Sequence, residues 1–189
     1  MLLVLAGAAC AGAASATVQN DLSGQPAGGP AACRPAELKA LFRGFQAAGG
    51  SLSGAVVLVD AGHDPCWLTG TPPSVTPLNE DGGAVTVRSR PLALPANAGD
   101  VELAPGAPLP GFGAPPAHGS AWFTLTWSNW CGDTIPSVRS LLVVLPAGGS
   151  VAAPLDTAVP TLVVGPAAPR CDDGRAASTL TIGRFQAAA

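Results

Sequence analysis

The chain has 189 residues, enough for one domain with its own core, and charged residues make up only 11% of it. With 24 glycines and 20 prolines it contains frequent turns and few of the long charged side chains that favour helices, which indicates an all-β protein. The formal net charge of −3 leaves no broad basic surface to release counterions from a polyanion, which argues against a nucleic-acid partner.

The N-terminal segment is apolar or small at almost every position, and we predict that residues 1–16 form a signal peptide. Ala14-Ser15-Ala16 fits the small-x-small cleavage pattern and gives Thr17 as the mature N-terminus. The run is short and lacks a preceding Lys or Arg, as expected if the true start codon lies upstream. Cys10 has two interpretations: it is lost with the signal, which we favour, or it is the lipidated cysteine of a lipoprotein. A lipid anchor there is the one membrane attachment we expect.

Residues 17–32 are rich in small residues and proline, which predicts a flexible linker. Cys33 then opens a domain that we place at residues 33–186. Its first segment has large apolar side chains at helical spacing, at Leu38, Leu41, Phe42 and Phe45. Taken alone, this spacing predicts a helix over residues 36–46.

The segment from Leu52 to Pro72 carries the clearest local signals. Residues 52–60 are apolar apart from Ser53, Gly54 and Asp60, with β-branched valines in the middle, and they predict a buried strand. A turn containing Gly62 and Asp64-Pro65 follows, and a short strand then opens with Cys66-Trp67.

Further short strands are predicted downstream, and the proline-rich residues between them, 92–116 and 151–169, are expected to be largely irregular. The predicted strands are 74–78 and 84–88, which form a hairpin around Gly82 and Gly83, then 101–106, 121–130, 137–145 and 178–185. Short strands separated by turns predict two packed antiparallel sheets.

Motifs that would indicate an enzyme are missing from the sequence. There is no G-x-S-x-G, no H-E-x-x-H, no phosphate-binding glycine loop and no C-x-x-C. His63 and His118 are interpreted as solvated loop residues, rather than as parts of a metal site or triad with Asp64, Asp133 or Asp172. Asp172-Asp173-Gly174 is interpreted as a turn rather than a calcium loop. We therefore expect no catalytic residues, no metal and no cofactor.

The tryptophans are the side chains best suited to contact a ligand. Alternation directs Trp122 and Trp127 to opposite faces of one strand, and we expect Trp127 in the core. Trp130 shares the Trp122 face only if the strand stays regular past Asn129. Because Trp67 and Trp130 lie at strand ends beside cysteines, we predict that one or the other, if exposed, forms part of a platform for stacking sugar rings; the competing interpretation places them in the core.

Several motifs in order resemble the actinobacterial domain-of-unknown-function family 4232, found in secreted proteins and lipoproteins. They are an opening Cys33, residues 66–72 for the family's C-x-L-x-G-x-P, a turn at 103–106, residues 125–132 and a late Cys171. Where the family often has an Asn-x-Gly turn before its second cysteine, this chain has Asp60-Ala61-Gly62. The resemblance implies an immunoglobulin-like antiparallel β-sandwich over about residues 33–185, makes the segment 36–46 a strand, and brings no established activity.

Four cysteines remain in the mature chain, and they allow three pairings. Chain order together with the family pattern favours Cys33 with Cys66 and Cys131 with Cys171. In the chain-entropy model each bridge would stabilise the fold by about 4 kcal/mol before strain is subtracted. A zinc site is the competing interpretation, but these single cysteines lack the close paired spacing that zinc sites use.

Together these features predict a non-enzymatic β-sandwich domain that is secreted or associated with the cell envelope and acts by binding or as a structural module. The alternative is a carbohydrate-binding or adhesive module that uses an exposed Trp67 or Trp130. Expected partners are a cell-wall glycan or another envelope protein.

Overall fold

The structure is a computed structural model, and it describes residues 31–93, 99–111, 114–133, 136–156 and 168–189. In this part of the chain there are twelve β-strands and one short 3-10 helix. The elements are β1 (Ala31–Ala32), η1 (Pro35–Glu37), β2 (Leu38–Ala48), β3 (Ser51–Asp60), β4 (Cys66–Leu68), β5 (Val75–Leu78), β6 (Arg88–Pro91), β7 (Val101–Leu103), β8 (Ala121–Ser128), β9 (Ser140–Val144), β10 (Ser150–Pro154), β11 (Thr179–Ile182) and β12 (Gln186–Ala187). The predicted signal peptide, Cys10 and the linker up to residue 30 lie outside the described residues.

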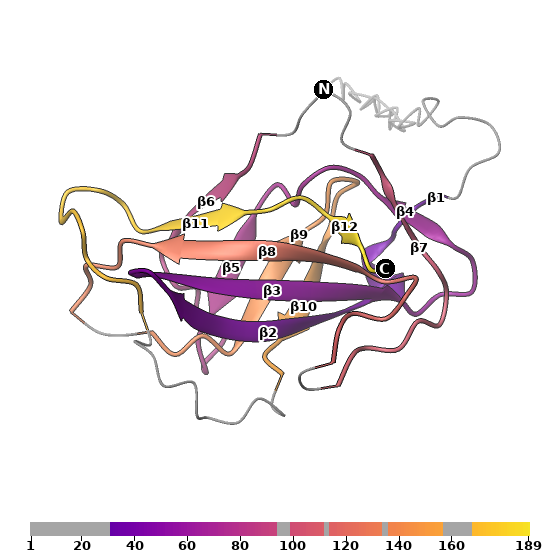
Figure 1. Cartoon of the computed structure of the whole chain (residues 1–189), viewed down its shortest axis with the longest axis horizontal. Helices are drawn as coiled ribbons and strands as arrows, with labels where there is room; N and C mark the ends of the chain where they lie inside the picture. The colour runs from indigo at the N-terminus through magenta and orange to yellow at the C-terminus, as the bar shows by residue number, and fades with distance from the viewer. Residues whose placement is uncertain (1–30, 94–98, 112–113, 134–135, 157–167) are drawn as a thin grey trace, which may run out of the picture.

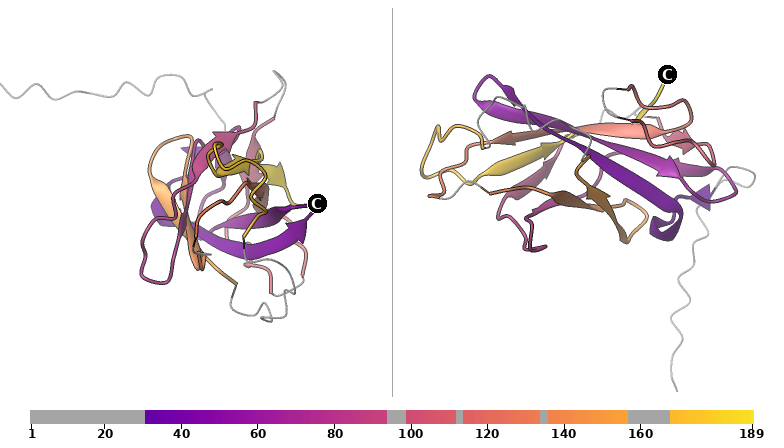
Figure 2. Two further views of the ribbon diagram at one scale, coloured as in Figure 1. Left: turned by 90° about the vertical axis from the view of Figure 1, so that its left-hand side faces the viewer. Right: turned by 90° about the horizontal axis from the view of Figure 1, so that it is seen from below.

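The strands form two facing sheets and a small third sheet (Figures 1 and 2). The largest has the order β2-β3-β8-β11-β6, and β12 also pairs with β8, near the beginning of that strand. It packs against the sheet β10-β9-β5, while β1-β4-β7 lies at one end. Most pairs are antiparallel, and the exceptions among the described strands are β11 with β6 and β1 with β4. The predicted all-β sandwich is therefore confirmed.

The hydrophobic core lies between the two facing sheets, because alternate side chains of each strand point inward. Its fully buried members include Leu52, Val56, Leu58, Phe123, Leu125, Trp127, Leu141, Val143, Leu180 and Ile182. Trp127 is buried as predicted, and its Nε1 donates a hydrogen bond to Ser178 Oγ at 2.7 Å. The polar atom of the largest core side chain is thus satisfied.

The helix predicted from the spacing of the first apolar residues is wrong, because Leu38–Ala48 forms strand β2. A β-bulge interrupts its pairing with β3 between Phe42 and Phe45, and Gly44 within it has a φ of 80°. The bulge brings Phe42 and Phe45 to the same face, with ring centroids 4.9 Å apart. A bulged strand can therefore place two apolar residues that are three positions apart on one face, as a helix does.

Three strands, β1, β10 and β12, lie outside every strand predicted from the sequence. Ala31–Ala32, assigned to the linker, pair with β4 as strand β1. Ser150–Pro154 overlap the segment expected to be irregular but form β10, which pairs along its length with β9. At the C-terminus, Gln186–Ala187 form the separate strand β12, which pairs with β8 and ends one residue beyond the predicted domain end.

The predicted hairpin at 74–78 and 84–88 forms only in part. Its first arm is β5, but the second makes a single bridge, between Ala84 and Leu78. The chain then crosses to the larger sheet, where β6 pairs in parallel with β11. Ser89 connects the two sheets at this crossing, since its Oγ donates to the Val75 carbonyl at 2.7 Å.

Both predicted disulfides are present. Cys33–Cys66 closes 33 residues and is buried beside β1 and β4, whereas Cys131–Cys171 closes 40 residues and is exposed beyond the end of β8. Two disulfides in one domain indicate an oxidising, extracytoplasmic environment. Among the described residues, no helix has the length and apolar character that crossing a membrane requires.

Candidate functional site

The chain leaves β8 through a residue that ends the regular strand. Asn129 has a φ of 59°, in the left-handed region that asparagine tolerates better than most residues. Its Oδ1 accepts hydrogen bonds from the N–H groups of Asp172 and Asp173, each at 2.9 Å, and its Nδ2 donates to the Asp173 and Ala176 carbonyls. Asn129 therefore fixes the β8 end to the loop before β11, beside the Cys131–Cys171 bridge.

The turn at Asn129 decides where Trp130 lies. Because the strand alternation is broken, Trp130 does not share the outer face with Trp122 but packs against the core residue Trp127, with ring centroids 5.5 Å apart and an angle of 76° between the rings. Gly132 lies close to the indole, since a Cβ there would be 2.8 Å from Trp130 Cζ2. Trp130 is half-buried between these neighbours.

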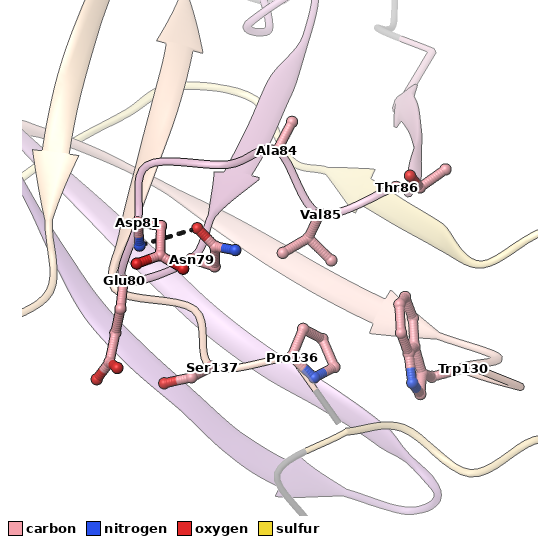
Figure 3. A pocket seen from close by; sticks show the side chains of 9 residues that line it. All are labelled: Asn79, Glu80, Asp81, Ala84, Val85, Thr86, Trp130, Pro136 and Ser137. Carbon is pink, nitrogen blue, oxygen red and sulfur yellow. Dashed lines mark hydrogen bonds between the residues drawn. The ribbon is translucent and has the colours of Figure 1, made fainter. Parts of the chain in front are cut away.

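Trp130 forms one wall of an open pocket of about 410 Å³, most of whose lining residues are exposed. Figure 3 shows the indole on one side, the turn that begins at Asn79 on the other, and Pro136 and Val85 between them. The lining residues are Asn79, Glu80, Asp81, Ala84, Val85, Thr86, Trp130, Pro136 and Ser137.

The polar wall of the pocket is built by the β5 turn. Asn79 Oδ1 accepts hydrogen bonds from the backbone N–H groups of Asp81 and Gly83, at 3.1 and 2.7 Å, which fixes the turn. Glu80 accepts a hydrogen bond from Arg139 Nε at 2.9 Å, so its carboxylate is oriented by an exposed ion pair. Thr86 and Ser137 add hydroxyl groups. The pocket thus combines one aromatic surface with several hydrogen-bonding groups.

The two tryptophans of the predicted platform are not brought together. Trp67 is half-buried on β4, at the end of the sandwich opposite to the end of β8 where Trp130 lies (Figure 1). Trp130 lines the pocket and Trp67 does not. The two indoles do not share one surface, and Trp67 and Trp130 each stay a separate candidate.

The polar wall was not named from the sequence. Residues 79–81 were interpreted only as a turn, and Ser137 as the start of a strand. Their approach to Trp130 depends on how the β5 turn packs against the segment before β9. No local motif signals such a contact, because it joins segments about fifty residues apart in the chain.

The residues considered for chemistry are placed apart from this pocket. His63 and His118 are exposed, Asp172 pairs with Arg170, and Asp173 Oδ1 accepts the Arg175 N–H at 2.8 Å within a turn. Among the residues that the structure describes, no three His, Cys, Asp or Glu side chains are grouped to hold a metal ion.

Fold and site together define a disulfide-linked, all-β sandwich with an aromatic-walled pocket at one end. No protein-family model, curated protein or solved structure matches the chain. The resemblance to the actinobacterial family 4232 therefore stays a prediction that rests on the order of its motifs.

Proposed function

We propose that the chain is a non-enzymatic module, secreted or held at the cell envelope, that binds a ligand outside the cytoplasm. The disulfides support the compartment, because such bonds persist where the surroundings are oxidising. The apolar N-terminal run supports export, with either cleavage before Thr17 or a lipid anchor at Cys10. Taken together, these features favour a cell-wall glycan or another envelope protein as partner over any cytoplasmic one.

The observation that carries a binding role is the position of Trp130. Its indole packs edge-to-face against Trp127 with Gly132 close beside it, and it forms a wall of the pocket. An aromatic ring fixed in this way contacts a ligand at little cost in side-chain entropy. The carboxylates, amide and hydroxyls that line the rest of the pocket can bond a polar ligand.

A carbohydrate is the ligand class that these groups favour. The apolar face of a sugar ring packs on an indole, while its hydroxyls need donors and acceptors such as Asn79, Asp81 and Ser137. A purely apolar ligand could contact the indole, Val85 and Pro136 but would use none of these polar groups.

The proposal is tested by titrating the oxidised mature chain with soluble cell-wall glycan fragments and following the heat of binding. Trp130→Ala should weaken binding about tenfold or more, as expected for a central aromatic contact. Asp81→Asn removes an exposed rim charge without touching the core and should weaken binding less.

Trp67→Ala is the matched control, because it removes a half-buried indole at the opposite end of the molecule. It should leave binding unchanged. If it abolishes binding while Trp130→Ala does not, the site lies at the β4 end; if neither variant changes glycan binding, the carbohydrate assignment fails.

A further inference from the structure

The outer face of the six-stranded sheet carries a line of polar side chains that the core does not use. Strand register aligns Thr181 on β11, Thr126 on β8, Ser53 on β3 and Gln46 on β2. Arg90 on β6 extends the line to the edge of the sheet, because it is paired with Thr181. Each of these residues is exposed or half-buried. With about 4.8 Å between neighbouring strands, the line is about 19 Å long.

A second line runs beside the first and lies two residues closer to the C-terminal end of β8. Arg88 pairs with Thr179, which pairs with Ser128. Ser51 precedes Leu52, the partner of Trp127, so extending this register by one residue places Ser51 next in the line on β3. The two lines are about 6.7 Å apart. We call this surface the hydroxyl face, and define it by Ser51, Ser53, Thr126, Ser128, Thr179 and Thr181 with Arg88, Arg90 and Gln46.

The hydroxyl face is open, whereas the other half of the same sheet is covered. Val57 and Val59 also point outward by alternation, yet only 1% and 2% of their surface is exposed. Arg43 Nη1 donates to the Ala114 carbonyl at 3.0 Å, which ties the segment between β7 and β8 over that half. Thr126 is exposed and Thr181 and Ser53 are half-buried, and no hydrogen bond engages their hydroxyls within the part of the chain that the structure describes.

Charge on the hydroxyl face is of one sign. None of its residues is acidic, and Arg88 and Arg90 are exposed with no carboxylate within ion-pair distance in the described part of the chain. This contrasts with Arg34, Arg139 and Arg170, each of which pairs with a nearby acid. Although the net charge of the chain is −3, the β6 edge of this sheet is positively charged.

We propose that the hydroxyl face binds an acidic polysaccharide. Guanidinium groups recognise carboxylates with two parallel hydrogen bonds, and two arginines on one edge strand can contact successive acidic groups of one chain. The Ser and Thr hydroxyls can exchange hydrogen bonds with sugar hydroxyls along the 19 Å line, which is about the reach of a polymer rather than of a single small anion. This site is separate from the Trp130 pocket and does not rest on it.

The test measures binding of the oxidised mature chain to immobilised polygalacturonate at low ionic strength, with dextran as the neutral polymer. The wild-type chain should bind polygalacturonate and not dextran. Arg88→Ala with Arg90→Ala should weaken binding about tenfold, since two exposed ion pairs are removed. Thr126→Val with Thr181→Val keeps the strand shape, removes two hydroxyls, and should weaken binding about threefold.

The matched control is Arg34→Ala with Lys39→Ala, which gives the same net charge but removes cations at the far end of the sandwich. It should bind like the wild type, and circular dichroism should show the same fold for all variants. The proposal is overturned if the wild type does not bind polygalacturonate, if the control loses as much as the Arg88 and Arg90 pair, or if the Thr variants bind unchanged. Tighter binding to vesicles of anionic lipid than to the polymer would also overturn it.

The two binding proposals fail independently. Trp130→Ala should leave polygalacturonate binding intact, and the Arg88 and Arg90 pair should leave glycan binding at the pocket intact.

Discussion

Asn129 and Asp173 exchange two hydrogen bonds: Asn129 Oδ1 accepts the Asp173 N–H at 2.9 Å, and Asn129 Nδ2 donates to the Asp173 carbonyl at 2.9 Å. The pair joins the end of β8 to a loop 44 residues later. It lies beside the Cys131–Cys171 disulfide and holds the backbone that carries Trp130. The pocket therefore depends on a polar junction as well as on a covalent one.

Two substitutions of Asn129 should separate the contribution of its side-chain hydrogen bonds to stability from that of its left-handed backbone conformation. Asn129→Gly loses the side-chain hydrogen bonds but keeps a backbone that adopts a φ of 59°, whereas Asn129→Ala loses both. Both variants should be less stable than the wild type, and Ala should be less stable than Gly by about 1 kcal/mol. Urea unfolding followed by circular dichroism measures the difference. Equal stability of the two variants would show that the left-handed conformation adds no cost.

Gly54 is the position on β3 against which the β2 bulge packs. A Cβ there would lie 2.8 Å from the Gly44 carbonyl oxygen and 2.9 Å from the Phe45 ring, and backbone cannot move aside easily. Gly54→Ala should lower the free energy of unfolding by about 1–3 kcal/mol through overpacking. Gly174→Ala, where a Cβ meets nothing within 4 Å, is the control and should change stability by less than about 0.5 kcal/mol. A Gly54→Ala variant as stable as this control would show that the bulge adjusts freely.

The bulge also explains one limit of prediction from sequence. Phe42 and Phe45 are three residues apart and share a face, which is a helical signature unless an extra residue is inserted into a strand. The signal for the insertion was Gly44, yet a single glycine indicates a bulge only once the partner strand is known. The buried strands β3, β8, β9 and β11 were predicted because their apolar and β-branched residues carry the signal locally.

Strand β10 and the pocket show why the rest could not be predicted. β10 consists of small residues and a proline, so its strand signal is weak, and its pairing with β9 forms it. The pocket wall opposite Trp130 comes from a turn whose sequence specifies only its own geometry. In contrast, both disulfides were predicted, because chain order and the family pattern select one of three pairings.

The two disulfides should differ in their response to a reductant. Exchange requires a thiolate to reach a sulfur atom, and Cys131 and Cys171 are exposed whereas Cys33 and Cys66 are only 2% and 4% exposed. Mild dithiothreitol under native conditions should open Cys131–Cys171 first. Alkylation followed by peptide mapping identifies the bridge that opens. Earlier opening of Cys33–Cys66, or a Cys66–Cys131 linkage in the starting material, would contradict the structure.

The proposed export predicts that the N-terminus of the chain is processed. Mass spectrometry of the native protein should find either a chain that begins near Thr17 or a diacylated Cys10, because the apolar run is expected to be processed. Intact Met1 on a cytoplasmic protein with free thiols would contradict both the extracytoplasmic location and the disulfide bonds.

The central claim, that Trp130 forms the wall of a ligand site, is tested most directly by the tryptophan indole N–H signals in an NMR titration with soluble cell-wall glycan fragments. Substitution of each tryptophan by Phe assigns the four signals. The Trp130 signal should shift on binding, while the signals of Trp67, at the far end, and of buried Trp127, bonded to Ser178, should move less. Binding that shifts the Trp67 signal and leaves the Trp130 signal in place, or no shift of any indole at saturating ligand, would contradict the claim.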